Sequence, residues 1–450
     1  MLYRKHHILL YIIILTVLLR GGMIIRNHQL HPSFFDIKLE KVQQKIKSNK
    51  LPYVNPFGYE IANLAYSIVA KKEGFSSPFG GSTGPSGWSA PGMVYIYALL
   101  FKLFGCFSKA ALLSLFFLAI LASVLMVLMI YSISLTLYNN QKVAALSALL
   151  FAMCPQDIWF FTQKFQQDFN AYAFLFILNF YLFIKFKTSQ ATPHLILFGI
   201  STGLSILFCP VLCLPASVCI IYYIFKHKDN LLDMFKNTGL FAIIVILIIS
   251  PYILHQKQRL DAWTFIKSNG QFEIYQGNSP EFEGVLTIKL FDALHPAQNT
   301  EEFQEYQRLG EIAYVQSKSP LFRNNFNFID FLKLTGKRCL YFFFIYKSYG
   351  DQNPEINYIW AIFYIAYFIP GLSMILYLLK TFNKLTHIDL LVYLYILAYA
   401  APYLCVGIMY RYSFPICTLT TILLAKTLHS CLTQLKPQKT IVTPLQTGNK

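Results

Sequence analysis

Ionisable side chains that could take part in chemistry stand where apolar or amphipathic segments of this chain begin. Asp168 opens the apolar run 168–186, Arg411 opens the run 411–430, and Glu60 opens an amphipathic segment. A carboxylate can accept the proton of a hydroxyl group, and a guanidinium beside hydrocarbon needs an anionic partner such as a carboxylate or a lipid phosphate. Structural roles also explain these positions, because acids stabilise helix N-termini and arginines anchor interfaces.

Recognisable cofactor motifs are missing from the sequence. It contains no P-loop, no dinucleotide fingerprint, no His-Glu-x-x-His and no Cys-x-x-Cys. The nine cysteines lie almost all in or beside apolar segments, which indicates small buried side chains. His295 stands alone before Pro296, and an isolated histidine is more often structural. If it meets an acid of the first polar stretch it could hold a divalent ion or a phosphate, so a divalent cation is the one cofactor that stays open.

The composition indicates a membrane protein. Hydrophobic residues make up 55% and charged residues 13% of the 450 residues, whereas a soluble domain has roughly 25% charged residues. The apolar runs are about 18 to 25 residues long, enough to cross a bilayer. This excludes a soluble enzyme, a disordered chain and a disulfide-stapled module. About ten transmembrane helices are predicted, at 8–25, 109–137, 143–157, 168–186, 194–208, 210–226, 237–255, 356–379, 387–408 and 411–430. Pro210 and Pro215 leave open whether 194–226 is a hairpin or one kinked helix.

The net charge of +17 is explained by topology. An even number of spans puts both termini on one side, and the short loops there carry fourteen basic and three acidic residues. By the positive-inside rule, both termini are predicted to be cytoplasmic and the basic edge to meet anionic membrane lipids, so no nucleic-acid site is inferred. The predicted regions are a first helix (1–25), a first extracytoplasmic loop (26–108), a helical core (109–255), a second extracytoplasmic loop (256–355), C-terminal helices (356–430) and a cytoplasmic tail (431–450).

The two long loops are predicted to contain helices that lie on the membrane. An amphipathic helix from about 59 to 71 places Ile61, Leu64, Ala65 and Ile68 on one face. A Gly/Pro/Ser-rich turn region follows, and the apolar segment 94–104 is too short to span and suits an interfacial helix. In the second loop, the charged stretch 299–317 predicts a solvated surface helix.

An ordered set of motifs in these loops resembles a known family. The segments 59–68, 74–79, 83–91 and 101–105, then Ser268-Asn269-Gly270, His295-Pro296, Leu309-Gly310-Glu311 and Arg411-Tyr412-x-x-Pro415, follow its pattern. The chain is similar to bacterial GT-C glycosyltransferases of the family 39 type, relatives of protein O-mannosyltransferases and of the lipid A aminoarabinose transferase. The resemblance implies a GT-C fold on the cytoplasmic membrane. It also implies inverting sugar transfer from a polyprenyl-phosphate donor to a lipid, glycan or protein acceptor at the outer face.

The resemblance also implies roles for individual residues. A hydroxyl acceptor needs a carboxylate base, and Glu60 and Asp36 compete for that role. Asp168 matches a second acidic position of the family, with Asp157 as a weaker candidate in the same short loop. The leaving phosphate needs positive partners, and the candidates are Arg411, Arg259, Lys267, Lys257 and His295. Tyr275, Trp88, Tyr314 and Trp263 are candidates for stacking on sugar rings.

The sequence leaves two alternatives from other protein classes open. A lipid-linked saccharide flippase would carry charged residues along its spans, which are nearly free of them. A non-catalytic envelope assembly protein would tolerate replacement of Glu60 and Asp168 by alanine.

Overall fold

The computed structural model describes residues 2–30, 57, 60–161, 167–279, 282–346, 358–381 and 384–434. Within these ranges the chain is almost entirely helical, and strand-like pairing is limited to the isolated bridges of Ser76 with Pro85 and of Val285 with Ile408. The predicted all-α polytopic fold is thereby confirmed.

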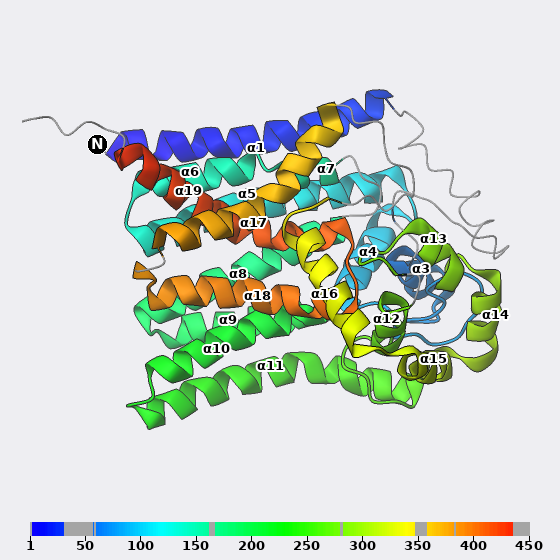
Figure 1. The fold of residues 1–450 in the computed structure, drawn as a ribbon. Helices are drawn as coiled ribbons and strands as arrows, with labels where there is room; N and C mark the ends of the chain where they lie inside the picture. Colours follow the sequence, from blue (N-terminus) through cyan, green and yellow to red (C-terminus); the bar gives the residue numbers. More distant parts are fainter. Residues whose placement is uncertain are drawn as a thin grey trace, which may run out of the picture.

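The long helices lie side by side along one axis and form a bundle (Figure 1). Eight segments of the described chain are long and apolar enough to cross a membrane, and α9 and α10 are apolar but shorter. These two account for the difference from the ten spans that the sequence predicts. The helices of the bundle are α1 (Leu2–Leu30), α5 (Lys109–Tyr138), α6 (Gln141–Ala152), α7 (Pro155–Phe160), α8 (Gln167–Ser189), α9 (Thr192–Phe208), α10 (Cys213–Lys226), α11 (Leu231–Leu260), α17 (Tyr358–Thr381), α18 (His387–Val406) and α19 (Cys417–Gln434).

The segment 194–226 is a hairpin. Gly199 lies against Ile244, and Gly203 lies against Ile248, so α9 and α11 run parallel to each other. The intervening α10 therefore runs in the opposite direction, after the short 3-10 turn Pro210–Leu212 (η3). A Cβ added at Gly203 would lie 2.8 Å from the Ile248 Cβ atom, which shows that small residues set the approach of these two helices.

Apart from α16 (Phe328–Phe343), which packs against α18, the remaining helices gather at one end of the bundle and form what we call the cap, at the right of Figure 1. The N-terminus of α1 and the end of α19 lie at the opposite end. The predicted helix at 59–71 is present as α3 followed by the π-helix η2, and the predicted interfacial helix at 94–104 is present within α4. The cap consists of α3 (Glu60–Tyr66), η2 (Ser67–Lys71), α4 (Pro91–Phe104), α12 (Gly270–Gly277), α13 (Ile288–Leu294), α14 (Thr300–Leu309) and α15 (Glu311–Asn325).

A buried ion pair fastens the first helix to the bundle. The Arg20 guanidinium on α1 donates to the Asp157 carboxylate on α7 at 2.6 Å, and both side chains are fully buried. Ser123 and Asn170 also donate to Asp157, at 2.9 and 2.6 Å. Every oxygen of this acid thus has a partner, which a buried carboxylate requires. Asp157, predicted as a weaker catalytic candidate, is therefore a structural residue that joins four helices.

The charged stretch 299–317 is not one solvated helix, contrary to the prediction. Gly310, with a φ of +75°, separates α14 from α15, and this conformation favours glycine because it lacks a Cβ atom. Glu311 then begins α15 with only 4% of its surface exposed. The prediction failed because the spacing of polar residues shows which face of a helix is polar. It does not show that residues of another loop cover that face and bury Glu311.

Candidate active site

Glu60 lies at the N-terminus of α3, at the boundary between the cap and the bundle. Its carboxylate accepts hydrogen bonds from the Trp88 indole N–H at 3.2 Å and from the Ser89 hydroxyl at 3.4 Å. Both donors come from the turn region before α4, which folds back over the start of α3. The side chain keeps 27% of its surface exposed, so a small hydroxyl compound can still reach the carboxylate.

His295 lies beside Glu60 and is buried. Its Nδ1 accepts the backbone N–H of Ala297 at 3.1 Å, so in the neutral ring the proton is on Nε2. That Nε2 lies 3.5 Å from the Glu60 Oε1 atom. Burial, reinforced by the charge of Lys267, lowers the pKa of His295 to about 3, so the ring remains neutral. The imidazole stacks on Phe291 at 4.1 Å between ring centroids. His295 therefore orients the Glu60 carboxylate without adding a positive charge.

A lysine–glutamate pair from the second loop completes the surroundings of Glu60. The Lys267 ammonium lies 3.8 Å from the Glu273 carboxylate, and Asn269 donates to the same carboxylate at 2.9 Å. Burial raises the pKa of Glu60 from 4.5 to about 7 and Glu273 adds to this rise, whereas Lys267, the Trp88 hydrogen bond and Arg411 oppose it. A carboxyl group with such a pKa exists in both protonation states near neutral pH, as a general base requires.

Arg411 faces the same region from the bundle. Its guanidinium lies over the ring of Phe169 at 5.0 Å and acts electrostatically on both Asp168 and Glu60. One carboxylate oxygen of Asp168 is buried and accepts no hydrogen bond from the described residues. The Tyr412 ring stacks on Phe169 at 5.5 Å. Arg411 thus lies close enough to Asp168 and to Glu60 for its charge to act on both carboxylates, although the three residues come from segments that are far apart in sequence.

A single buried carboxylate joins the two loops beneath this cluster. Glu311 accepts hydrogen bonds from Ser86 and Gly87 of the first loop, both at 2.6 Å. It also accepts from Ser268 at 2.6 Å and from Tyr306 at 2.7 Å in the second loop. Because Ser268 follows Lys267 and Gly87 precedes Trp88, this junction fixes two neighbours of Glu60 relative to each other. Burial raises the pKa of Glu311, and the hydrogen bonds counteract that rise.

Two other predicted phosphate ligands, Arg259 and Lys257, are engaged by other partners. The Arg259 guanidinium donates to the backbone carbonyl of Glu73 at 2.7 Å, which ties the end of α11 to the first loop. The Lys257 ammonium bonds to Asp261 at 2.7 Å, one helical turn away. No interaction joins either side chain to Glu60 among the described residues. Asp36, the alternative base, lies outside the described residues.

Two of the residues predicted to stack on sugar rings, Trp88 and Tyr314, are buried, so the prediction is wrong for them. Trp88 is only 1% exposed, and its indole packs against Phe79 and Phe272, each at 5.0 Å between ring centroids. Tyr314 is fully buried and donates its hydroxyl to Glu302. Neither ring has a face open to a sugar, because both belong to the aromatic core of the cap. Tyr275 is half-buried against that core, and Trp263 is 69% exposed.

Three residues of the site escaped the sequence-based predictions. Ser89 and Glu273 touch Glu60 or its lysine, and Glu311 holds the loops together. Glu273 and Glu311 did carry a signal, because Glu273 lies in the first turn of α12, just after the motif Ser268-Asn269-Gly270, and Glu311 begins α15 within the motif Leu309-Gly310-Glu311. Within the described part of the chain, no three His, Cys, Asp or Glu side chains converge as metal ligands. Glu60 and His295 supply a pair of donor groups there.

Comparisons with known proteins agree with this architecture. The family model described as dolichyl-phosphate-mannose-protein mannosyltransferase matches residues 88–255, a stretch that includes Trp88 and Asp168. No curated protein matches the chain significantly. Among solved structures, the apo oligosaccharyltransferase of Archaeoglobus fulgidus is 14% identical with a TM-score of 0.54, over 96% of this chain and 52% of that chain.

Two further structures are similar at comparable identity. The Archaeoglobus fulgidus oligosaccharyltransferase AglB, in complex with an inhibitory peptide and a dolichol-phosphate, is 14% identical with a TM-score of 0.50, over 98% of this chain and 53% of that chain. ArnT from Cupriavidus metallidurans in the apo state is 12% identical with a TM-score of 0.47, over 88% of this chain and 59% of that chain. The chain thus spans about half the length of the oligosaccharyltransferases it matches. The resemblance to GT-C glycosyltransferases that the motifs indicate is confirmed, and the fold is the GT-C membrane fold.

Proposed function

We propose that this protein is a membrane glycosyltransferase that moves a sugar from a polyprenyl-phosphate-linked donor to an acceptor at the outer face of the cytoplasmic membrane. The observation that carries the proposal is the Glu60 carboxylate, which is held by Trp88 and Ser89, lies 3.5 Å from His295 and is within electrostatic reach of Lys267 and Arg411. A lipid donor cannot leave the bilayer, so its reacting carbon must be met at such a boundary. The family model and the dolichol-phosphate in the AglB complex support a lipid-phosphate donor.

The reaction is a single displacement at the anomeric carbon. Glu60 takes the proton of the acceptor hydroxyl while the acceptor oxygen forms a bond to the anomeric carbon. The bond from that carbon to the phosphate oxygen breaks, and polyprenyl phosphate leaves with the electron pair. This step inverts the configuration of the sugar, and it applies to a hexose or a pentose.

The two cations act on the leaving group. Negative charge grows on the departing phosphate, and preorganised positive groups stabilise a charge that develops in the transition state. Arg411 matches a phosphate in shape because its planar guanidinium offers two parallel donors. Asp168 and Phe169 hold that guanidinium in place from α8. Lys267 approaches from the cap, so the phosphate would lie between the two elements.

The orientation follows from the same charge distribution. The short loops at the end of the bundle where α1 begins and α19 ends are rich in Lys and Arg, and the positive-inside rule supports a cytoplasmic position for that end and an outer position for the cap. A divalent ion is compatible with the proposal, since a related Archaeoglobus fulgidus structure was solved as a complex with Zn and sulfate. Lipids, glycans and proteins remain the acceptor classes.

The test uses the full-length protein in proteoliposomes with radiolabelled undecaprenyl-phosphate hexoses and pentoses. Glu60→Gln should lower the rate of donor consumption by about 10²- to 10⁴-fold, because that is the usual contribution of a general base. Glu301→Gln is the matched control, since Glu301 also lies in the first turn of a cap helix but is exposed and far from Glu60 in sequence. Equal rates for both variants, with both proteins folded, would refute Glu60 as the base and favour Asp36.

A further inference from the structure

Arg338 on α16 is a buried arginine that no acid neutralises. None of its surface is exposed, and no Asp or Glu among the described residues pairs with its guanidinium. An arginine side chain keeps its charge in a protein, and a buried charge is costly unless polar groups surround it. The groups that surround Arg338 therefore indicate why a charge is present at this position.

Backbone carbonyls of two helices take the place of a carboxylate. The Nη1 atom of Arg338 donates to the carbonyls of Leu404 and Cys405, both at 3.0 Å, in the last turn of α18. The Nη2 atom donates to the carbonyl of Gly277, the last residue of α12, and to the Asn278 side chain at 3.0 Å. The C-terminal end of a helix carries partial negative charge. Arg338 thus stabilises two helix ends that meet beside it.

The planar shape of the guanidinium suits this junction. Its two Nη atoms serve four acceptors, and only the Nε–H group has no partner among the described residues. The Asn278 amide adds a further bond between the helix ends, because it donates to the Cys405 carbonyl at 3.3 Å. A lysine would keep the charge, but its three N–H groups extend from one atom and do not form the same fork.

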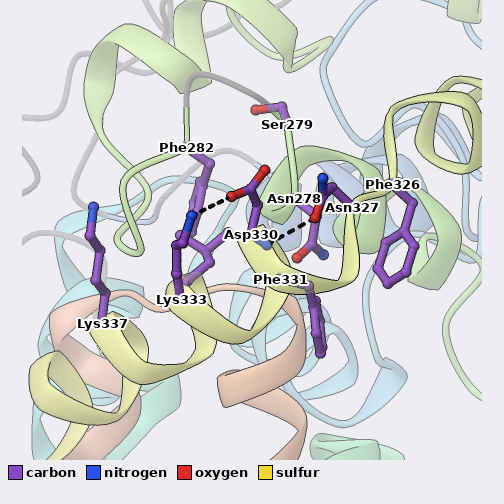
Figure 2. Close-up of a pocket in the computed structure, with 10 residues that line it drawn as sticks. Asn278, Ser279, Phe282, Phe326, Asn327, Asp330, Phe331, Lys333 and Lys337 are labelled. Atoms are coloured by element: carbon purple, nitrogen blue, oxygen red, sulfur yellow. Dashed lines mark hydrogen bonds and ion pairs between the residues drawn. The ribbon is translucent and has the colours of Figure 1, made fainter.

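The two helix ends are packed closely. A Cβ atom added at Gly277 would overlap the carbonyl oxygen of Val406, so only glycine fits at this point of α12 without a shift of α18. The ring of Phe282 lies beside the guanidinium of Arg338, at 5.2 Å. Figure 2 shows Phe282 and Asn278 next to α16, where both border a cavity of about 410 Å³.

On the cap side, the junction leads to the neighbours of Glu60. Glu273 lies in the first turn of α12 and pairs with Lys267 at 3.8 Å, and both charges act on Glu60. The eight residues of α12 span about 12 Å. Because a helix this short moves as one piece, a displacement of Gly277 at its end is passed on to Glu273 at its start.

On the bundle side, the junction leads to Arg411. The chain leaves α18, and the carbonyl of Ile408 accepts the backbone N–H of Leu286 from the cap at 2.9 Å. The 3-10 helix η5 (Tyr410–Ile416) follows and contains Arg411. Because α16 packs against both α18 and η5, the helix that carries Arg338 supports the whole approach to Arg411.

We propose that Arg338 is a positioning residue for sugar transfer: it holds α12 against α18 and thereby sets how the charges of the cap face Arg411. The inference rests on the proposed function, in which the leaving phosphate lies between Lys267 and Arg411. The charges of Glu273 and Arg411 both act on Tyr412, so the two elements that Arg338 joins also approach each other at the site. Arg338 acts through these elements and not on the reacting groups.

The first measurement needs no turnover. Hydrogen exchange of the full chain in nanodiscs is followed by mass spectrometry for the wild type and for Arg338→Lys. Exchange should become faster in peptides that cover 282–288 and 403–409, because these segments are joined by the bond from Leu286 to Ile408. Arg308→Lys is the matched control, since Arg308 is an exposed arginine in the last turn of α14, and it should leave both segments unchanged.

The second measurement separates positioning from stability. In Arg338→Lys, the kcat of donor consumption should fall about 10²-fold, because a misplacement of about 1 Å costs that much. The dissociation constant for undecaprenyl phosphate should rise about tenfold, equivalent to about 1.4 kcal/mol. Gly203→Ala is the control for stability, since its added Cβ atom crowds α11 and lowers the melting temperature by overpacking. Per folded protein, Gly203→Ala should keep both constants of the wild type.

Asn278→Ala is a milder variant that carries the test if Arg338→Lys does not fold. It removes one of the four acceptors and the bond to Cys405, so the dissociation constant should rise about threefold, as for the loss of one hydrogen bond. A lower melting temperature in both variants, with constants equal to those of Gly203→Ala, would show a purely structural role and overturn the positioning role. Unchanged exchange in both segments would overturn the junction itself.

The outcomes also separate this inference from the proposed function. If the wild type consumes no donor, yet Arg338→Lys still weakens the binding of undecaprenyl phosphate, the transferase is refuted and Arg338 is retained as a residue that positions a phosphate site. If the wild type consumes donor and Arg338→Lys does so with the same kcat and dissociation constant, the inference about Arg338 alone is refuted.

Discussion

Replacing Lys267 should shift the pH dependence of transfer in a predictable direction. The pKa of Glu60 is raised to about 7, and Lys267 is the strongest influence that opposes the rise. The base form of Glu60 therefore dominates only above about pH 7, and the rate should increase with pH through that value. In Lys267→Gln the carboxylate loses its main positive neighbour, so the pKa rises further and the ascending limb moves to higher pH.

The size of the shift follows from the exposure of the lysine. The Lys267 side chain is 34% exposed, so water and salt screen its charge, and a shift of at most about one pKa unit is expected, equivalent to about 1.4 kcal/mol. A rise of one unit lowers the ionised fraction of Glu60 at pH 7 from about one half to about one tenth. The rate at pH 7 should then fall about fivefold for this reason alone, and partly recover at higher pH.

The assay is the rate of donor consumption from pH 5 to 9 in proteoliposomes, with the half-maximal pH of the ascending limb as the readout. This quantity is independent of the plateau, which Lys267→Gln also lowers if the lysine stabilises the leaving phosphate. Lys289→Gln is the control, because Lys289 is exposed on α13 and is not among the groups that act on Glu60. An unchanged limb, or a shift to lower pH, would refute the assignment of the titrating base to Glu60.

Three further predictions concern the parts that position the site. Glu311→Ala leaves four donors without their acceptor and should destabilise the cap by about 3–5 kcal/mol, which limited proteolysis of the loops would detect as faster cleavage; unchanged cleavage would show that the loops are held elsewhere. Gly203→Ala forces a Cβ against α11 and should lower the melting temperature through overpacking of about 1–3 kcal/mol, whereas Gly239→Ala, which meets no atom within 4 Å, should be neutral or stabilising. Arg20→Met strands a buried carboxylate and should cost about 3–5 kcal/mol, and adding Asp157→Leu should recover part of that loss; equal stability of the single and double variants would contradict the ion-pair interpretation.

The sequence alone determined that this is an all-α membrane protein with many spans. The apolar runs are long enough to cross a bilayer, and their even number predicted that the two ends of the chain lie on one side; in the structure, the start of α1 and the end of α19 lie at the same end of the bundle. The spacing of apolar residues in 59–71 predicted the helix α3. The apolar run 94–104 is too short to span a membrane, and this identified α4 as a helix of the cap. Glu60, Asp168 and Arg411 could be selected because a charge at the edge of hydrocarbon is costly and because ordered motifs surround them.

Only the tertiary structure decided which of these charges meet. Spacing along the chain does not show that Asp157 is held by Arg20, that Arg259 is bound to a loop carbonyl, or that Trp88 donates to Glu60 from within a core. Glu311 looked like one more acid of an exposed helix, yet it is the acceptor that joins both loops. Burial and pairing depend on elements that come from distant parts of the chain, so a local pattern cannot specify them.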